Sequence, residues 1–202
     1  MTGYQEVNLK RIIQNVGEDR VRALLSNFSC PMNQDVETFI RQKAIEFAKQ
    51  EVASTHLVFA SYRDEVVLIG FYSIAIKQFS IKRSALTANL RHKIAKFAAY
   101  NAELMRYDIA APLIAQLAKN YAAGYNQLIT GDELLQMACD RVRQAQMIIG
   151  GKVTYLECEN KPALIQFYER NGFKVFSKRP LDHDETKVMF GKELIQLLKY
   201  FS

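Results

Sequence analysis

The chain has 202 residues, of which 49% are hydrophobic and 24% are charged. This composition excludes an intrinsically disordered protein and is sufficient for a buried core without disulfides or metals. The 27 Lys and Arg residues outnumber the 21 Asp and Glu residues, which leaves a formal net charge of +6. That charge suits an acidic partner, such as a phosphate-bearing cofactor or RNA, but is small for a dedicated nucleic-acid-binding domain. We expect a single domain over residues 1–202.

Several segment types are missing from the sequence. The longest nearly apolar run, from Val66 to Ile76, is too short for a membrane helix, which needs about 20 residues. The N-terminal residues contain no apolar signal core. The 3 Cys residues are an odd number without a close pair, and no spacing of His and Cys resembles a zinc site. We therefore expect a cytoplasmic protein with reduced thiols, no membrane association and no metal.

The N-terminal half predicts two helices followed by a hairpin. Apolar side chains at helical spacing mark the helices, over residues 18–28 and 35–51. Two segments rich in Val, Ile, Phe and Tyr, over residues 57–61 and 66–76, predict strands, and the polar turn between them predicts a β-hairpin. The sequence from Ser84 to Tyr107 then predicts one or two further helices.

The segment 77–108 carries most of the net charge. It contains seven Lys and Arg residues against two acidic residues, a net charge of +5. Such an insert could bind an acidic substrate such as tRNA, and it could contact a phosphate group of a cofactor. It could equally be the solvated face of a helix. The sequence leaves these three interpretations open.

After this segment the pattern predicts a buried strand over residues 111–118 and a long helix from Gly131 to Ile149. Thr130 and Glu133 have the spacing of a capping box at the start of this helix. Gly150-Gly151 is typical of its end. The apolar stripe of the helix predicts that it packs on the sheet.

The C-terminal third predicts alternating strands and helices. Asn160 is expected to cap a short helix that has Pro162 in its first turn and ends at Asn171-Gly172. The other predicted elements are strands over residues 152–158, 173–177 and 186–190 and a terminal helix over residues 191–201. This order of elements predicts an α/β (mixed α+β) architecture with helices on both faces of the sheet.

A motif in this region resembles a known family. The residues from Leu164 to Phe173 read Leu-Ile-Gln-Phe-Tyr-Glu-Arg-Asn-Gly-Phe and follow the predicted strand 153–158. They resemble the C-terminal signature of the GNAT family, the GCN5-related N-acetyltransferases, which is a strand followed by A-x-x-[FL]-Y-x-x-x-G-F. Gly131-Asp-Glu-Leu-Leu is similar to the G-x-x-L-L that opens the cofactor-binding helix of the family. The resemblance extends over about residues 20–178 but is specific only over residues 153–173.

The resemblance implies a GNAT-like twisted mixed sheet with a helical insert between the third and fourth strands. It also implies that acetyl-CoA is a cosubstrate and that a primary amine of unknown identity and size attacks it directly in a ternary complex. Two alternatives remain. One is a non-catalytic GNAT-fold binding module, and the other is a toxin-like enzyme that acetylates aminoacyl-tRNA. The layout of Phe28-Ser-Cys30 and the helix before the hairpin resembles the toxin branch. Formation of a homodimer also stays open.

The resemblance places Tyr168 where its hydroxyl can protonate the departing thiolate, since a thiol has a pKa of about 8.5 and a tyrosine one of about 10. Otherwise the Tyr168 ring simply packs on the sheet. Glu157, which shares one face of its strand with Glu159, could relay a proton from the amine, or it could be solvated or ion-paired. We interpret Cys158 as a small buried thiol rather than a nucleophile.

Eight residues are implied to bind acetyl-CoA: Leu117, Ala118, Lys119, Thr130, Gly131, Asp132, Asn160 and Phe167. The first three end the predicted fourth strand, whose backbone in the family holds the pantetheine and the acetyl carbonyl. The next three begin the long helix, where free N–H groups and the helix dipole could bind pyrophosphate. A plain capping box without a ligand explains the same residues.

The sequence also departs from the family at the cofactor. The pyrophosphate loop of the family, [QR]-x-x-G-x-[GA], has no match in the chain. Asp132 and Glu133 place negative charge beside the expected phosphates. Asn160 is one residue out of place, and Leu164 stands where the family has alanine. A weak or altered cofactor site is therefore expected.

Overall fold

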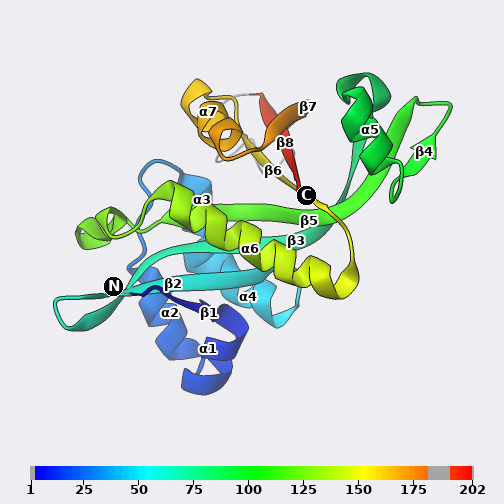
Figure 1. Cartoon of the computed structure of the whole chain (residues 1–202). Coiled ribbons are helices and arrows are strands. Elements are labelled where there is room, and N and C mark those ends of the chain that lie inside the picture. Colours follow the sequence, from blue (N-terminus) through cyan, green and yellow to red (C-terminus); the bar gives the residue numbers. More distant parts are fainter. Residues whose placement is uncertain (1–2, 182–191, 202) are drawn as a thin grey trace. The chain divides into compact units, whose positions relative to one another are not determined.

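The computed structural model describes residues 3–181 and 192–201. The described residues form a sheet of eight strands in the order β1-β2-β3-β5-β6-β8-β7, with β4 paired to β5 (Figure 1). The predicted mixed α+β class is confirmed. The described chain divides into two compact units, one of residues 3–75 and 114–140 and one of residues 76–113, 141–181 and 192–201. We call these unit 1 and unit 2. That the chain is a single domain stays a prediction.

Unit 1 contains the N-terminal helices, the hairpin and the start of the long helix. Its elements are β1 (Gln5–Asn8), α1 (Leu9–Val16), α2 (Glu18–Ser26), α3 (Gln34–Thr38), the π-helical turn η1 (Phe39–Lys43), α4 (Ala44–Lys49), β2 (Ser54–Tyr62), the first part of β3 (Glu65–Lys82), the last part of β5 (Arg106–Lys119), the 3-10 turn η3 (Ala122–Gln127) and the first part of α6 (Gly131–Ile149). Both predicted N-terminal helices are confirmed, the second with a π-helical turn inside it. The sequence analysis missed β1 and α1, which are too short to show a clear period.

The predicted hairpin is confirmed as β2 and β3, which pair antiparallel with Leu57 opposite Phe71. The turn consists of Arg63 and Asp64, both with positive φ (51° and 63°). Two successive residues in this conformation form the turn whose twist matches that of the flanking strands. Strand β3 continues six residues beyond the predicted end, to Lys82.

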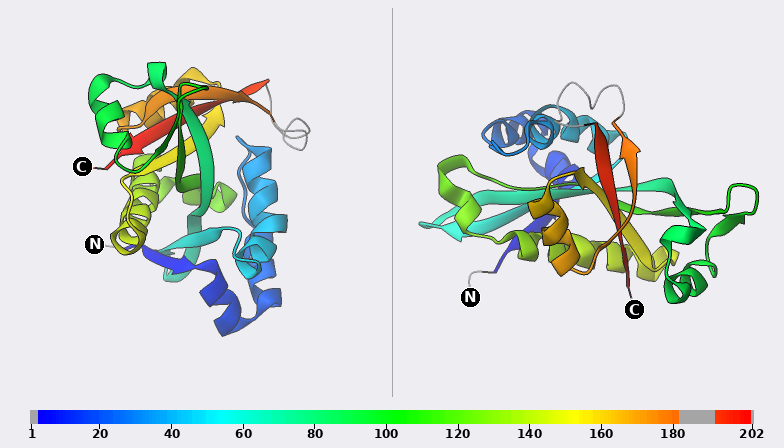
Figure 2. Two further views of the ribbon diagram at one scale, coloured as in Figure 1. Left: turned by 90° about the vertical axis from the view of Figure 1, so that its right-hand side faces the viewer. Right: turned by 90° about the horizontal axis from the view of Figure 1, so that it is seen from above.

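The core of unit 1 lies between the helices and the hairpin. Leu25 of α2, Phe28 of the loop after it and Ile40 of η1 are fully buried. They pack in one cluster with Leu57 and Phe71 of the sheet. The rings of Phe28 and Phe71 pack edge to face with centroids 5.2 Å apart. Figure 2 shows helices α1 to α4 on one face of β2 and β3 and α6 on the other face. Burial of these apolar faces is the main stabilising contribution to the unit.

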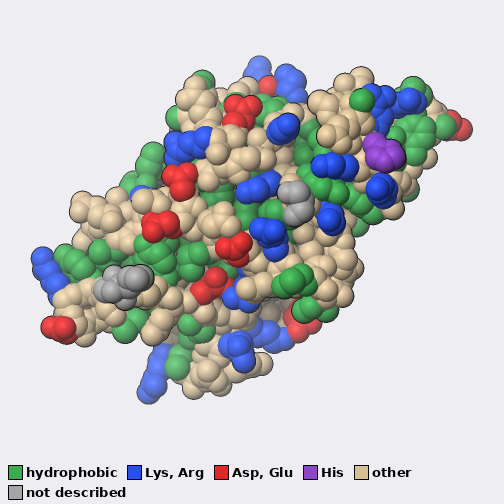
Figure 3. Space-filling model, viewed as in Figure 1, with side chains coloured by type: hydrophobic (Ala, Val, Ile, Leu, Met, Phe, Trp, Pro, Cys, Tyr) green, Lys and Arg blue, Asp and Glu red, His purple; other side chains and the backbone are tan. Residues whose placement is uncertain are grey.

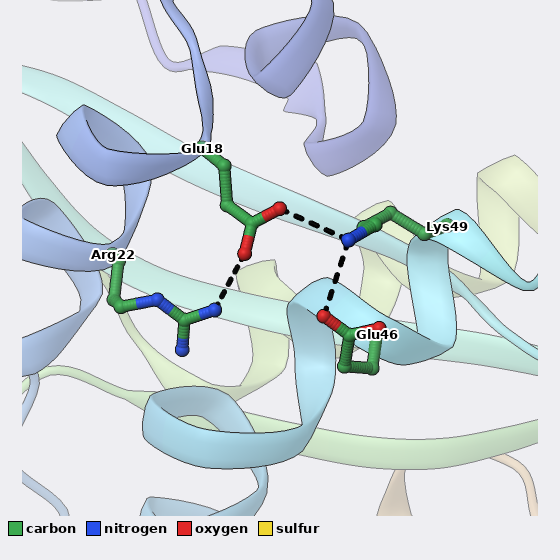
Figure 4. Close-up of polar contacts among 4 residues, drawn as sticks. All are labelled: Glu18, Arg22, Glu46 and Lys49. Atoms are coloured by element: carbon green, nitrogen blue, oxygen red, sulfur yellow. Dashed lines mark hydrogen bonds and ion pairs between the residues drawn. The ribbon is translucent and has the colours of Figure 1, made fainter.

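An ion-pair network joins α2 to α4 on the surface of unit 1 (Figure 4). Glu18 accepts from Arg22 Nη2 at 2.6 Å and from Lys49 Nζ at 3.0 Å, and Lys49 also lies 3.3 Å from Glu46. Hydrogen bonds from Arg22 and Lys49 lower the pKa of Glu18. Because the four side chains reach solvent, the network contributes little to stability.

Unit 2 contains the C-terminal strands and the basic insert. In addition to the remaining parts of β3, β5 and α6, its elements are the 3-10 turn η2 (Arg83–Ala85), α5 (Ala88–Ile94), β4 (Ala99–Asn101), β6 (Val153–Glu159), α7 (Pro162–Arg170), β7 (Lys174–Pro180) and β8 (Glu193–Tyr200). The helical prediction for Ser84 to Tyr107 is wrong outside α5. Instead, β4 pairs with the early start of β5, with Tyr100 opposite Tyr107. Pairing with β5 therefore determines that residues 99–101 form a strand and not a helix.

The predicted terminal helix over residues 191–201 is also wrong, because residues 193–200 form the strand β8. Strand β8 lies between β6 and β7, and Leu198 faces Tyr155 on one side and Lys174 on the other. Five successive residues of β8 are buried, so Leu194, Ile195, Leu197 and Leu198 fall on both faces instead of alternating with polar residues. Periodicity alone cannot distinguish such a short apolar segment from a buried helix. The predicted strand 186–190 lies outside the described residues.

Two general features of the described chain bear on the sequence predictions. None of its helices is both long and apolar enough to cross a membrane. Cys30, Cys139 and Cys158 are all buried, and none of them forms a disulfide. Small thiols are commonly buried in protein cores, so their burial does not indicate a reactive role.

Candidate active site

The predicted signature motif forms the end of α7 and the turn into β7. Gly172 has a φ of 84°, a left-handed conformation that favours glycine. The N–H groups of Gly172 and Phe173 donate to the carbonyl oxygens of Glu169 and Tyr168, at 2.9 and 3.1 Å. Phe173 is fully buried, and its ring packs edge-on against Tyr168 with the centroids 6.0 Å apart. The glycine and the phenylalanine of the motif therefore hold Tyr168 in place.

Tyr168 itself is half-buried, and its ring also packs against Phe167 at 4.9 Å. Burial raises the pKa of the Tyr168 hydroxyl, and the neighbouring Cys158 raises it further. The hydroxyl therefore keeps its proton at neutral pH and well above it. Such a group can donate a hydrogen bond or a proton to a developing thiolate, and it is a poor nucleophile.

Cys158 lies beside Tyr168 and is buried on β6. Burial raises the pKa of its thiol to about 11, and Glu159 adds to the effect. The reactive form of a cysteine is the thiolate, which is scarce at neutral pH in this environment. The interpretation of Cys158 as a structural thiol rather than a covalent nucleophile agrees with this environment.

Glu157 takes part in a partly buried ion pair. Its Oε2 accepts from Nη2 and Nε of Arg179 on β7, at 2.6 and 2.9 Å, and its Oε1 accepts from Nε2 of Gln196 on β8 at 2.8 Å. The side chain of Glu157 is 12% exposed. Because both oxygens are occupied, a general base at this position would first have to leave Arg179. The geometry favours the ion-paired alternative, and the role as a base stays a prediction.

Two other predicted residues lie at the ends of α7. Phe167 is half-buried, and the guanidinium of Arg170 lies over its ring at 5.1 Å. Asn160 is exposed, and the residue that caps α7 is Lys161. The expectation that Asn160 caps this helix is therefore wrong. Because Pro162 takes the first helical position, the cap falls on the residue just before it.

The end of β5 in unit 1 holds the three predicted strand residues. A Cβ at Gly70 of β3 would lie 3.0 Å from the carbonyl oxygen of Ala118 and 3.3 Å from the side chain of Leu134 on α6. Only glycine therefore allows the end of β5 and the start of α6 to approach β3 so closely. Lys119 donates from Nζ to the carbonyl oxygen of Asn126 at 2.9 Å, which ties the strand end to the loop that follows. Leu117 is the remaining member of the group.

The sequence analysis missed Asn120, which fixes the same strand end. It is 4% exposed, and its Nδ2 donates to the carbonyl oxygen of Leu68 at 2.8 Å. Its Oδ1 accepts from the N–H groups of Ser29 and Ala122, each at 3.0 Å. An asparagine directly after a buried strand was the available signal, because its side chain can satisfy the backbone groups that the strand leaves behind.

The capping box at the start of α6 is confirmed. Glu133 N–H donates to Thr130 Oγ1 at 3.1 Å, and Glu133 Oε2 accepts from the N–H and hydroxyl of Thr130 at 2.8 and 2.7 Å. The hydrogen bond from the Thr130 N–H is the largest cause of the lowered pKa of Glu133. Both donors of Thr130 are thus used within the protein, which does not favour it as a phosphate ligand. The N–H of Gly131 makes no backbone hydrogen bond within the described part of the chain.

The predicted site residues therefore fall into two groups. Unit 1 contains Leu117, Ala118, Lys119, Thr130, Gly131 and Asp132, and unit 2 contains Glu157, Asn160, Phe167 and Tyr168. Within unit 1, the strand end and the helix start meet at Gly70. Within unit 2, Tyr168 lies beside Phe167 on α7 and near Cys158 on β6.

No family model and no curated protein matches this sequence. Solved structures do match over nearly the whole chain. A crystal structure described as a bacterial toxin matches 99% of this chain and 92% of its own, with a TM-score of 0.63 and 16% identity. AtaT complexed with acetyl-methionyl-tRNAfMet matches over 96% and 94%, with a TM-score of 0.62 and 15% identity. A Tyr-to-Phe mutant of KacT matches over 97% and 94%, with a TM-score of 0.62 and 14% identity.

This chain has the fold of these toxins. The GNAT-like fold predicted from the motif at residues 153–173 is thereby confirmed. The likeness extends through the N-terminal helices and the basic insert, because it covers almost all of the chain. At 14–16% identity it establishes the fold, while the activity has to be argued from the residues.

Proposed function

We propose that this chain is an acetyl-CoA-dependent N-acetyltransferase whose acceptor is the amino group of an aminoacyl-tRNA. The observation that carries the proposal is the nearly full-length likeness to AtaT in complex with acetyl-methionyl-tRNAfMet. A further neighbour, an AtaT mutant bound to the C-terminus of the antitoxin AtaR and to acetyl-CoA, matches 98% of this chain with a TM-score of 0.58. Aminoacyl-tRNA is a cytoplasmic substrate, so the proposal also places the chain in the cytoplasm.

Tyr168 is the residue to which we assign a chemical role. In the proposed reaction the amine nitrogen attacks the acetyl carbonyl carbon, a C–N bond forms and the C–S bond breaks. The hydroxyl of Tyr168, which burial keeps protonated, donates to the sulfur as it leaves. The proton lost by the amine passes to water, because both oxygens of Glu157 are engaged by Arg179 and Gln196. The phenolate left on Tyr168 then recovers a proton from water, which balances the two transfers.

Acetyl-CoA supplies the activated acetyl group when it is bound. The residues that fit it in unit 1 are the end of β5, from Leu117 to Lys119, and the N–H of Gly131 at the start of the 19-residue helix α6. Thr130 does not fit, since Glu133 already uses both of its donors. The proposal therefore includes a modest affinity for the cofactor.

Calorimetric titration with acetyl-CoA is the first test. We expect a Kd on the order of 10–100 μM, equivalent to about −5.5 to −7 kcal/mol. The second test is transfer of radiolabelled acetyl from acetyl-CoA to a pool of charged tRNA, with the same pool after deacylation as the control. Label should appear only on the charged pool, and it should be lost when the aminoacyl ester is hydrolysed. Label on neither pool would refute the aminoacyl-tRNA acceptor.

A second candidate function is a non-catalytic binding module with the same fold. The absent glycine loop and the occupied capping box at Thr130 and Glu133 favour it. This candidate predicts no heat of binding and no thermal shift at millimolar acetyl-CoA. A measurable Kd together with acetyl transfer would exclude it.

A further inference from the structure

Residues 77–108, which we call the basic arm, extend from the sheet of unit 2. The ends of β3 and β5 form the arm, and η2, α5 and β4 lie between them. The N–H of Arg83 donates to the carbonyl oxygen of Met105 at 2.9 Å and holds the two strands together beyond the sheet. The arm is therefore a structured extension whose two strand ends are joined by a backbone hydrogen bond.

The positive charge of the arm is largely uncompensated. Its cations are Lys77, Lys82, Arg83, Arg91, Lys93, Lys96 and Arg106. Within the described part of the chain only Arg106 pairs with a carboxylate, that of Asp108 at 3.2 Å. The other six make no ion pair with a described residue, and Figure 3 shows Lys and Arg side chains gathered over this region. Like charges held close together repel, and a polyanion that binds them relieves the repulsion.

Two hollows flank α5 and concentrate these cations. One, of about 220 Å³, is lined by Lys93 and Lys174 together with Asn89 and Tyr200. Lys93 Nζ lies 4.8 Å above the Tyr200 ring, so it is held at the wall of the hollow.

The second hollow, of about 600 Å³, is lined by Lys82, Arg83 and Arg91 together with Leu104 and Met105. The buried Nε of Arg91 has no hydrogen-bond partner among the described residues. Donors of this kind on both sides of one helix are suited to two successive phosphates on a strand.

The arm also exposes large apolar side chains among its cations. Phe97 is 42% exposed and Tyr100 is 40% exposed. One side of the Tyr100 ring packs on Tyr107 at a centroid distance of 4.9 Å, which fixes the ring. Exposed aromatic rings next to cations are typical of surfaces that bind single-stranded nucleic acid, where bases stack on the rings and phosphates contact the cations.

We propose that the basic arm binds a single-stranded segment of the RNA acceptor, with phosphates in the two hollows beside α5 and bases stacked on Phe97 and Tyr100. This inference rests on the proposed function for the choice of RNA as the polyanion. It names the part of the chain that selects the acceptor. A duplex could meet the cations, but its paired bases could not stack on the rings.

The test is the binding of a short fluorescent single-stranded RNA, measured by anisotropy without acetyl-CoA. The double variant Lys82→Glu/Arg83→Glu should weaken binding at least about tenfold and lower the salt slope by about 1.4, since each phosphate contact on a single strand contributes about 0.7. The variant Phe97→Ala should weaken binding by about tenfold and leave the salt slope unchanged, because it removes stacking only. Circular dichroism and melting temperature verify that both variants are folded.

The matched control is Arg20→Glu/Lys43→Glu, two exposed cations of unit 1 with the same change of charge. It should bind RNA within about twofold of the parent, because neither residue belongs to the arm. Parent-like binding by both arm variants would overturn the inference. So would equal affinity for the same RNA in a duplex, or displacement of the RNA by vesicles of anionic lipid.

The outcomes also separate this inference from the proposed function. A parent protein that binds single-stranded RNA through the arm but acetylates no charged tRNA refutes the aminoacyl-tRNA acceptor and supports the arm as an RNA-binding site. If the parent acetylates charged tRNA and both arm variants bind RNA with the affinity of the parent, the proposed function is supported. The inference that the arm binds RNA is then refuted.

Discussion

The backbone N–H of Phe173 donates to the carbonyl oxygen of Tyr168, and the two rings pack edge to face. Gly172 lies between them and turns the chain in a left-handed conformation. Lys199 of β8 closes this turn from outside, since its Nζ donates to the carbonyl oxygen of Asn171 at 2.9 Å. The position of Tyr168 is therefore determined by the residues that follow it and by a neighbouring strand.

Tyr168→Phe should lower kcat by about 10²–10⁴ with little change in the affinity for acetyl-CoA. The ring and its packing remain, and only a hydrogen bond made in the transition state is lost. Stability should fall by no more than about 1 kcal/mol, the usual contribution of one hydrogen bond. Release of free thiol measures the rate. A Phe variant within about threefold of the parent would remove Tyr168 from the mechanism and leave water as the proton donor.

The same variant should change stability at alkaline pH. Burial raises the pKa of Tyr168 in the folded chain above its ordinary value of 10.0. Above that value the unfolded chain loses the proton while the folded chain keeps it, so stability falls as pH rises. In Tyr168→Phe this contribution is absent, and the alkaline decrease in melting temperature should be smaller than in the parent. An unchanged alkaline profile would contradict the burial of the hydroxyl.

Gly70→Ala should weaken acetyl-CoA binding and lower the melting temperature. The new methyl group would lie 3.0 Å from the carbonyl oxygen of Ala118, a backbone atom that can move only if the end of β5 moves with it. Overpacking of this kind typically costs about 1–3 kcal/mol. Calorimetry and thermal melting measure the two effects. Gly3→Ala is the matched control, because a methyl group there meets nothing within 4 Å.

Glu157→Gln distinguishes a structural carboxylate from a catalytic base. We expect it to destabilise the protein by about 1.5–3 kcal/mol, because the charged hydrogen bonds to Arg179 are lost. The rate per folded molecule should stay close to that of the parent. Urea denaturation and thiol release measure these two quantities, with the exposed Glu169→Gln as the control. A large loss of rate with unchanged stability would restore Glu157 as the base.

Glu133→Gln should alter stability in acid. Hydrogen bonds from Thr130 lower the pKa of Glu133 in the folded chain below its ordinary value of 4.5. The ionised Glu133 therefore stabilises the folded chain at any pH above its ordinary pKa. This stabilisation is lost as the pH falls through the lowered pKa of the folded chain. The variant should therefore lose stability near neutral pH and show a smaller acid-induced decrease than the parent. Denaturation at several pH values measures this, and Glu103→Gln, an exposed carboxylate on the arm, should retain the parent profile.

Much of the fold could be predicted from local sequence. The hairpin β2–β3, the capping box at Thr130 and the full length of α6 follow from patterns a few residues long. The motif that ends in Gly172-Phe173 identified the fold, since its residues satisfy one another within a single turn. The catalytic role of Tyr168 stays a prediction. Local hydrogen bonds and periodic burial are properties that adjacent residues largely determine.

Other features were decided only by contacts between distant parts of the chain. Strand β8 was predicted as a helix because its partners β6 and β7 begin about 40 and 20 residues earlier, and their pairing overrides local preference. Glu157 was a candidate base by sequence, and the ion pair with Arg179 became visible only when β6 and β7 were placed on either side of β8. The sequence by itself determined which residue types were present for the chemistry. The tertiary structure decided which of these residues keep a free donor or acceptor. A polar atom that already forms a hydrogen bond with a residue far away in the sequence is not available to bind a ligand.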